Sequence, residues 1–357
     1  MKPAVILPVL NPDEKFTNFV RNLIESGFED IVVVNDGSSA DYDHFYDEAA
    51  ENPQVIVLKH EVNRGKGAAL KTAFGYLADN RIDIDVAITC DGDGQHSVDS
   101  MKGCLQAYEE HPDSVIIGGR DFDDKNIPAR SRFGNKVSSF VYKFACGIKL
   151  KDTQTGLRVI PAKCFESFSK LKGDRYEYET NMLIEIVNRN IPYYEIPIET
   201  IYIDDNASSH FNPLKDSLKI YGVILRYFIK FIISSIASWV VDIGVYAILE
   251  FALQKHMDLG TRVLICTIAS RVISSIFNYI LNRKGVFKSV DNVRSTAAKY
   301  YILAICQMGA SYGLVYFFTH ILKVSGVLEL IVKCVVDLCL FIFSYNIQRR
   351  WVFKNKK

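Results

Sequence analysis

The stretch ITCDGDGQHS, residues Ile88 to Ser97, places two carboxylates and one amide two residues apart, directly after an apolar run. The apolar run has the length and composition of a buried strand, so Asp91, Asp93 and Gln95 would follow its C-terminal end. Side chains two apart on an extended chain point to one side, where unpaired carboxylates would repel each other. A divalent cation removes that repulsion, and oxygen ligands suit Mg²⁺ or Mn²⁺. The stretch therefore predicts a metal site.

The pattern has two other structural interpretations. An EF-hand loop that starts at Asp91 needs a glycine where this chain has His96, and a bidentate glutamate where it has Lys102, so it is excluded. A turn rich in Asp and Gly that merely ends the strand stays open at this point.

The opening stretch is one of five β-rich runs that helical patterns separate. The others are AVILPVL (4–10), DIVVVND (30–36), QVIVLKH (54–60) and SVIIGG (114–119), and the run of the opening stretch is DVAITCD (85–91). Strands that alternate with helices predict an α/β fold with a mostly parallel, doubly wound sheet. Ligands bind such sheets beyond the strand C-termini, where residues 35–38, 63–67, 91–93 and 119–120 should converge.

The 357-residue chain divides into two parts of opposite charge. Residues 1–228 contain 26 basic and 35 acidic residues, whereas residues 229–357 contain 16 and 6. The basic part has apolar runs long enough to cross a bilayer, which predicts four membrane spans at about 229–251, 263–281, 300–321 and 327–347. We expect a multi-pass protein of the inner or plasma membrane.

The distribution of basic residues predicts the membrane orientation. Lys and Arg gather before the first span, in the loop between the second and third, and at the C-terminal tail. The positive-inside rule then places the front domain and both termini in the cytoplasm. The N-terminus shows no signal-peptide pattern, and the eight cysteines have no CxxC spacing, which argues against a zinc site or a disulfide framework. We expect no nucleic-acid partner, and a homo-oligomer stays open.

The membrane part contains an internal repeat. FNYILNRKGVF (277–287) and FSYNIQRRWVF (343–353) share one pattern at an offset of 66 residues, which predicts two duplicated hairpins in the same orientation. Before them, residues 212–228 mix basic and apolar side chains as an amphipathic helix on an anionic membrane does. Charges inside the predicted spans are costly unless paired, so Arg271 should face Asp242 or Asp337, and Lys333 should also find a partner.

Two polar segments of the front part are candidates for nucleotide contacts. Gly65 and Gly67 open a predicted helix whose N-terminal amides suit a phosphate, but Leu70 occupies the third glycine position of the dinucleotide fingerprint. A simple loop-to-helix junction is the alternative. Asp36, at the end of its strand, suits a base or ribose contact or, alternatively, a capping turn.

Taken together and in this order, VILPVLN, VVVNDGSS, NRGKGAAL, TCDGDGQH, GGRD and DTQTGLR resemble the family 2 glycosyltransferases with a GT-A fold. The resemblance covers about 1–210 and is to the branch that includes dolichyl-phosphate mannose synthase and the bacterial polyprenyl-phosphate sugar transferases. The four-span part resembles the GtrA-like membrane family, whose members are proposed to move lipid-linked sugars across the membrane. It implies a GT-A domain at 1–211, a juxtamembrane helix at 212–228 and a membrane domain at 229–357.

The resemblance also implies roles for individual residues. Asp91 and Asp93 would hold the metal and the diphosphate, with Gln95 as a further metal ligand, and Asp152 would lie at the sugar. One departure is that Leu10 replaces an aromatic residue of the family and Pro12 follows Asn11, so the nucleotide is not fixed. The implied nucleotide contacts are Pro8, Leu10, Asp36, Lys66 and Asp91, and the implied contacts of the acceptor phosphate are Arg120, Arg130 and Arg132. A basic membrane-facing patch stays open for Arg130 and Arg132, and a turn cap stays open for Asp152.

The implied reaction is displacement at the anomeric carbon of a nucleotide-sugar, UDP-glucose first, by a polyprenyl phosphate such as undecaprenyl phosphate. A phosphate nucleophile is already anionic, so it requires no strong base. The product would serve a cell-surface or cell-wall glycan. A transporter or scaffold that only binds nucleotide-sugars stays open. A processive polysaccharide synthase is disfavoured, because its Q-x-x-R-W motif is one residue too long for QRRW (348–351).

Overall fold

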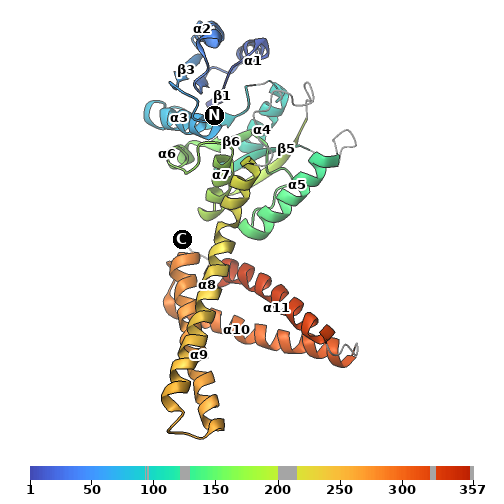
Figure 1. The fold of residues 1–357 in the computed structure, drawn as a ribbon. Helices are drawn as coiled ribbons and strands as arrows, with labels where there is room; N and C mark the ends of the chain where they lie inside the picture. The colour runs from blue at the N-terminus through green and yellow to red at the C-terminus, as the bar shows by residue number, and fades with distance from the viewer. Residues whose placement is uncertain (93, 95, 121–128, 200–214, 322–326, 354–357) are drawn as a thin grey trace. The chain divides into compact units, whose positions relative to one another are not determined.

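The computed structural model describes residues 1–92, 94, 96–120, 129–199, 215–321 and 327–353. The chain divides by its contacts into two compact units, Met1–Ile224 and Leu225–Lys357. That division falls inside the predicted juxtamembrane segment. Figure 1 traces both units from the N-terminus to the C-terminus.

The first unit is a seven-stranded sheet with helices on both faces, in the strand order β3-β2-β1-β4-β6-β5-β7. Strand β1 pairs in parallel with β2 and β4, whereas β6 lies antiparallel between β4 and β5. The predicted mostly parallel α/β sheet is therefore confirmed, with one reversed strand that was not foreseen. The strands are β1 Pro3–Val9, β2 Ile31–Asn35, β3 Val55–Lys59, β4 Val86–Thr89, β5 Val115–Arg120, β6 Arg158–Pro161 and β7 Tyr193–Ile198.

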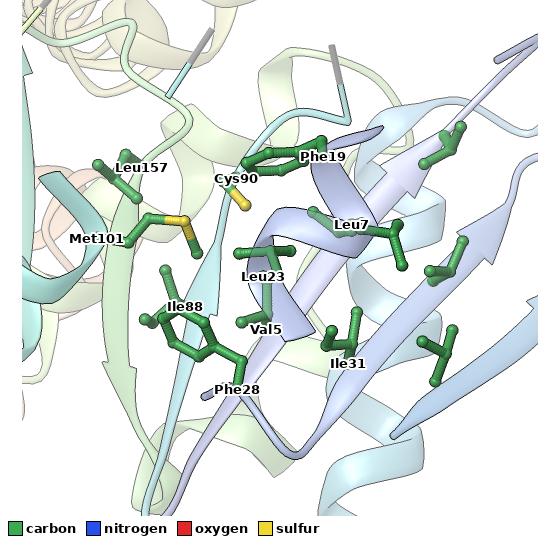
Figure 2. Packing of buried hydrophobic residues seen from close by; sticks show 14 of the residues in the cluster. Val5, Leu7, Phe19, Leu23, Phe28, Ile31, Ile88, Cys90, Met101 and Leu157 are labelled. Carbon is green, nitrogen blue, oxygen red and sulfur yellow. The ribbon is translucent and has the colours of Figure 1, made fainter. Parts of the chain in front are cut away.

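Alternation along the strands divides the core between the two sheet faces. Val5 and Leu7 of β1 and Ile88 of β4 pack against Leu23 of α1 and Met101 of α4 in one buried cluster (Figure 2). On the opposite face α3 packs against β1 and β2, and α6 and α7 pack against α3. The helices of this unit are α1 Glu14–Glu25, α2 Asp43–Ala50, α3 Lys66–Asn80, α4 Val98–Glu110, α5 Ala129–Val141, α6 Phe165–Ser169 and α7 Glu177–Asn188.

Gly37 shapes the loop that follows β2. Its φ is +76°, and a Cβ added there would lie 2.1 Å from the carbonyl carbon of Val62. We expect Gly37→Ala to lower the free energy of unfolding by about 2–5 kcal/mol, combining left-handed strain with overpacking. Gly27→Ala is the matched control, because Gly27 has a φ of +92° but no neighbour within 4 Å. Thermal unfolding midpoints of the two purified variants would compare them, and equal midpoints would contradict the expected clash.

The second unit is helical. Among the residues that the structure describes, three helices are long and apolar enough to cross a membrane, namely Phe228–Leu253, Leu259–Val286 and Val293–His320. The fourth predicted span forms helix α11 (Val327–Ile347), which carries Glu329, Lys333 and Asp337 and is not among the three; that it crosses the bilayer stays a prediction. The first helix, α8 (Lys215–Leu253), runs without a break through the predicted juxtamembrane residues 215–228. The others are α9 (Leu259–Leu281) and α10 (Val293–Tyr316).

The two sequence repeats meet through equivalent residues. Asn282 donates a hydrogen bond to Gln348, which lies 66 residues later, and the rings of Phe287 and Phe353 stack at 5.2 Å, again at that offset. Asn282 also bonds Asn278, as Gln348 bonds Ser344. Contact between equivalent positions is the property of a two-fold interface, which supports the predicted duplication.

Charged residues inside the predicted spans form two ion pairs. Arg271 lies 3.5 Å from Asp242, and Lys333 lies 2.7 Å from Asp337. The expected partner of Arg271 is therefore confirmed. Ser311 bonds both Lys333 and Asp337, so the second pair joins α10 to α11.

Candidate active site

Asp91 and Lys66 meet at the C-terminal edge of the sheet. Asp91 follows β4, and Lys66 is the first residue of α3, where it is brought by the loop after β3. The Lys66 Nζ lies 2.7 Å from Asp91 Oδ1 and 3.2 Å from Glu179 Oε1 on α7. The Lys66 ammonium thus joins two carboxylates from separate elements. The sequence predicted Lys66 and Asp91 for this site but not Glu179.

Arg158 on β6 and Gly156, two residues before it, lie beside this cluster. Arg158 is 1% exposed, donates to the backbone oxygen of Glu179 at 3.2 Å, and lies 4.0 Å from the Glu179 carboxylate. Gly156 gives the carboxylate room, because a Cβ there would lie 2.9 Å from Asp91 Oδ2 and 3.2 Å from Lys66 Nζ. The Gly156 carbonyl is held by the Thr89 hydroxyl. A larger residue at position 156 would therefore require the Asp91 and Lys66 side chains to shift.

The electrostatics of the cluster keep its charges in place. Burial alone would lower the pKa of Lys66, but Asp91 and Glu179 outweigh it and raise that pKa above its ordinary value. Burial would likewise raise the pKa of Asp91, yet Lys66, His96 and Arg120 lower it. Burial lowers the pKa of His96 itself. At neutral pH the site thus presents an ionised carboxylate and an ammonium beside an imidazole.

A second charged pair lies at the end of β5. Arg120 donates to Asp152 through Nε at 2.7 Å and through a terminal nitrogen at 3.3 Å. Asp152 is fully buried and also accepts from the Gln154 amide. Glu195 of β7 in turn accepts the backbone amides of Lys151 and Asp152. The structure brings the predicted Arg120 and Asp152 together, and it adds Glu195 as the group that fixes their loop.

Asp36 holds the loop that carries Lys66. Its carboxylate accepts hydrogen bonds from the amides of Arg64 at 3.0 Å and Gly65 at 2.7 Å, and from His60 at 2.7 Å. Asp36 is 4% exposed. Of the roughly four acceptor positions of a carboxylate, three are used within the protein. Asp36 therefore has one acceptor position left for a nucleotide. Its hydrogen bonds in this structure hold the loop that leads into α3.

The structure gives fewer contacts, or none, for the other predicted site residues. Pro8 lies within β1 and Leu10 directly follows it, both half-buried, and the Pro8 carbonyl lies 3.8 Å from where a Cβ of Gly92 would be. Arg130 and Arg132 lie on α5; the side chain of Arg130 is outside the described part. Asp93 and Gln95 lie outside the described residues altogether.

The described residues include one of the three predicted ligands of a divalent cation. They contain no group of three His, Cys, Asp or Glu side chains that could hold a metal, and of the predicted ligands they include Asp91 alone. Asp91 is an ionised, hard oxygen donor whose side chain is 36% exposed, and Mg²⁺ and Mn²⁺ prefer such donors. Its bond to Lys66 shows that the position already attracts a cation. The donor chemistry agrees with the predicted metal, whose remaining ligands would be Asp93 and Gln95.

Comparison with known proteins finds two family models that match the chain. Residues 4–168 match the model of glycosyl transferase family 2, and residues 230–353 match the GtrA/DPMS transmembrane domain. An uncharacterized protein of Methanocaldococcus jannaschii is 30% identical over 62% of this chain and 90% of its own length. A UDP-N-acetylglucosamine–dolichyl-phosphate N-acetylglucosaminyltransferase of Methanococcus voltae is 30% identical over 56% of this chain and 86% of its own length.

Among solved structures, mannosyl-3-phosphoglycerate synthase of Rubrobacter xylanophilus is similar at a TM-score of 0.46, with 16% identity over 63% of this chain and 72% of that one. The predicted fold class, an α/β domain of the GT-A kind followed by a helical membrane domain, is confirmed.

Proposed function

Because this chain belongs to glycosyl transferase family 2 and continues into a GtrA/DPMS transmembrane domain, we propose that it transfers a sugar from a nucleotide-sugar to polyprenyl phosphate at a membrane surface. The observation that carries the proposal is the Lys66–Asp91–Glu179 cluster at the sheet edge, attached in one chain to apolar helices. A soluble acceptor would require no such attachment.

The donor in this proposal is a UDP-sugar, with UDP-glucose as the first candidate and UDP-N-acetylglucosamine as the second. The second is named for the similar Methanococcus voltae enzyme. Lys66 would leave Asp91 for the donor's diphosphate and keep its contact with Glu179, which is 14% exposed and lies within 3.2 Å. A lysine suits this task as a compact point charge on a flexible stem.

The acceptor phosphate in this proposal binds Arg120, whose guanidinium is oriented by Asp152, together with Arg130 and Arg132. Arginine forms bidentate contacts with phosphate. The phosphate oxygen would displace the nucleotide with inversion at the anomeric carbon. A Mg²⁺ or Mn²⁺ ion held by Asp91, Asp93 and Gln95 would supply charge stabilisation for the leaving diphosphate. The catalytic domain and both termini would face the cytoplasm, and undecaprenyl phosphate is the acceptor in a bacterial membrane.

A lipid-extraction assay tests the proposal. We expect membranes with this protein, incubated with labelled UDP-glucose or UDP-N-acetylglucosamine, Mn²⁺ and polyprenyl phosphate, to place label in an acid-labile lipid. A chelator should abolish the transfer. Label in an insoluble polymer would indicate a processive synthase instead. Bound donor without any transfer would indicate a transporter or scaffold, and either result would refute the proposal.

We also propose that a pocket in the membrane unit accepts the product's headgroup. A pocket of about 860 Å³ is lined by Arg271, Ser311, Tyr312, Lys333 and Asp337, among others. Charged and hydroxyl groups of this kind mark substrate pathways when they lie within membrane segments. We propose that the lipid-linked sugar passes through this unit. The alternative is that the Arg271–Asp242 and Lys333–Asp337 pairs only join the helices.

A further inference from the structure

The cluster at the sheet edge carries as many cations as carboxylates. Lys66 pairs with Asp91 at 2.7 Å and with Glu179 at 3.2 Å. Arg158 lies 4.0 Å from the same Glu179 carboxylate. These two carboxylates and two cations sum to no net charge. The affinity of a site for a divalent cation depends on the charge of its ligands, so these four side chains attract one weakly while Lys66 stays on Asp91.

One oxygen of Asp91 is already bound to a cation of the chain. The Lys66 Nζ lies 2.7 Å from Asp91 Oδ1, and the two side chains are only 19% and 36% exposed. Mg²⁺ binds a carboxylate oxygen at about 2.0–2.1 Å, so a metal ion on Oδ1 would lie within about 5 Å of the ammonium. Like charges repel more strongly where water is partly excluded. The ammonium and a metal ion therefore compete for this oxygen.

The backbone that carries Lys66 is fixed on both sides. Before it, Asp36 accepts two amides of the preceding loop. After it, a Cβ added to Gly67 would lie 2.4 Å from the Cβ of Tyr178 on α7, so the start of α3 packs directly against that helix. The stem of a lysine is flexible. The ammonium can thus change partners by side-chain rotation, without a movement of α3.

Glu179 can keep Lys66 in the site during such a change. Its carboxylate lies 3.2 Å from Nζ, on a different element from Asp91. The buried Arg158 donates to the backbone oxygen of Glu179 at 3.2 Å and so holds the first turn of α7 in place. A lysine that leaves Asp91 for an anion in the site therefore keeps one carboxylate partner and can return when the anion leaves.

We propose that Lys66 is an internal counter-cation, which occupies Asp91 in the donor-free enzyme and allows a divalent cation to bind there only when a nucleoside diphosphate draws the ammonium away. Diphosphate and metal then bind with positive coupling, and the coupling is reciprocal. The inference rests on the proposed function for the diphosphate as the anion. The competition between Lys66 and a divalent cation at Asp91 does not depend on sugar transfer.

A manganese titration of the full chain in phosphatidylcholine nanodiscs tests the competition. Free Mn²⁺ is measured by electron paramagnetic resonance without nucleotide. Lys66→Met should bind Mn²⁺ at least about 10-fold more tightly than the unsubstituted chain, because a like charge near the ion is removed from a partly buried site. Lys71→Met is the matched control: Lys71 is on the same helix, is 20% exposed and pairs with Asp174, and its replacement should leave the affinity unchanged.

Added UDP tests the coupling. With a protein-free titration as the reference, UDP should raise the Mn²⁺ affinity of the unsubstituted chain by a larger factor than that of Lys66→Met. Equal factors would overturn the proposal, and so would a Lys66→Met chain that binds Mn²⁺ no more tightly than Lys71→Met. Asp91→Asn added to Lys66→Met should remove the gain; a gain that persists would place the ion away from Asp91 and refute the assignment.

Glu179→Gln gives a second test, which decides the question if Lys66→Met does not fold. Lys66 then keeps Asp91 as its carboxylate partner, so the Mn²⁺ affinity without nucleotide should fall below that of the unsubstituted chain. An equal or higher affinity would overturn the proposal. The expected gain in Lys66→Met, found together with no sugar transfer to lipid by the unsubstituted chain, would support the competition at Asp91 and refute the proposed function alone.

Discussion

Asp91→Asn should abolish sugar transfer to lipid, with an expected loss of at least about 10²–10³-fold in kcat, the scale observed when one preorganised charge contact is removed from an active site. The change keeps the side-chain volume and removes its charge. Lys66 would then keep Glu179 as its carboxylate partner, and the proposed metal would lose a ligand. Asp93→Asn should have an effect of the same size. The measurement is labelled, solvent-extracted lipid at saturating donor and Mn²⁺.

The loss should not come from unfolding. Asp91 is 36% exposed, so its neutralisation should shift the unfolding midpoint little. Asp99→Asn is the matched control, because Asp99 is an exposed residue on α4 of the same segment, and it should keep the activity of the unsubstituted enzyme. Turnover by Asp91→Asn at the unsubstituted rate would remove Asp91 from the site, whereas an equal loss in Asp99→Asn would assign the effect to general disturbance of the loop.

The sequence allowed the sheet edge to be predicted because the evidence for it is local. Each strand is a short apolar run, and each polar segment follows its strand directly. Parallel strands place their C-terminal ends on one edge, so the meeting of Lys66 with Asp91 followed from order alone. The same reasoning could not reveal that β6 runs antiparallel between β4 and β5, since strand direction depends on how the chain returns after α5.

The partners of the predicted residues could not be found in this way. Glu179, Arg158 and Glu195 come from α7, β6 and β7. Glu195 reaches Asp152 across 43 residues of chain, Arg158 reaches Glu179 across 21, and Glu179 reaches Lys66 on α3 from α7. Their signal in the sequence is faint: Arg158 is a charge inside the apolar run LRVIP (157–161). A buried arginine requires a carboxylate or carbonyl nearby, but no local rule says which one.

In the membrane unit, too, a pattern within the sequence could be predicted, whereas the course of the backbone through a change of surroundings could not. The repeat at 66 residues was visible in the sequence, and the Asn282–Gln348 bond joins its equivalent positions. The continuity of α8 from Lys215 to Leu253 was not foreseen. A change from amphipathic to wholly apolar composition indicates a change of surroundings, and the backbone helix can continue through it without a break.

Asp152→Asn is expected to impair both folding and acceptor use. Asp152 is fully buried and takes two hydrogen bonds from the Arg120 guanidinium, so loss of its charge should cost about 1.5–3 kcal/mol of stability. Arg120 would also lose its orientation. If Arg120 binds the acceptor phosphate, KM for polyprenyl phosphate should rise by about 10-fold for each 1.4 kcal/mol of lost contact, while KM for the donor changes little.

A double-mutant cycle separates these effects. Arg120→Met and Asp152→Asn should be coupled by about 0.5–3 kcal/mol in the free energy of unfolding, as residues in direct contact are. Asp113→Asn is the control: its bond with Lys163 joins side chains that are 74% and 47% exposed, and such surface pairs contribute about 0–1 kcal/mol. Additive effects of the two changes on stability would argue against the pair. If KM for the acceptor is unchanged in both single variants, the phosphate site is not at Arg120. It would then be assigned to Arg130 and Arg132 of α5, and replacing either of these should raise KM for the acceptor.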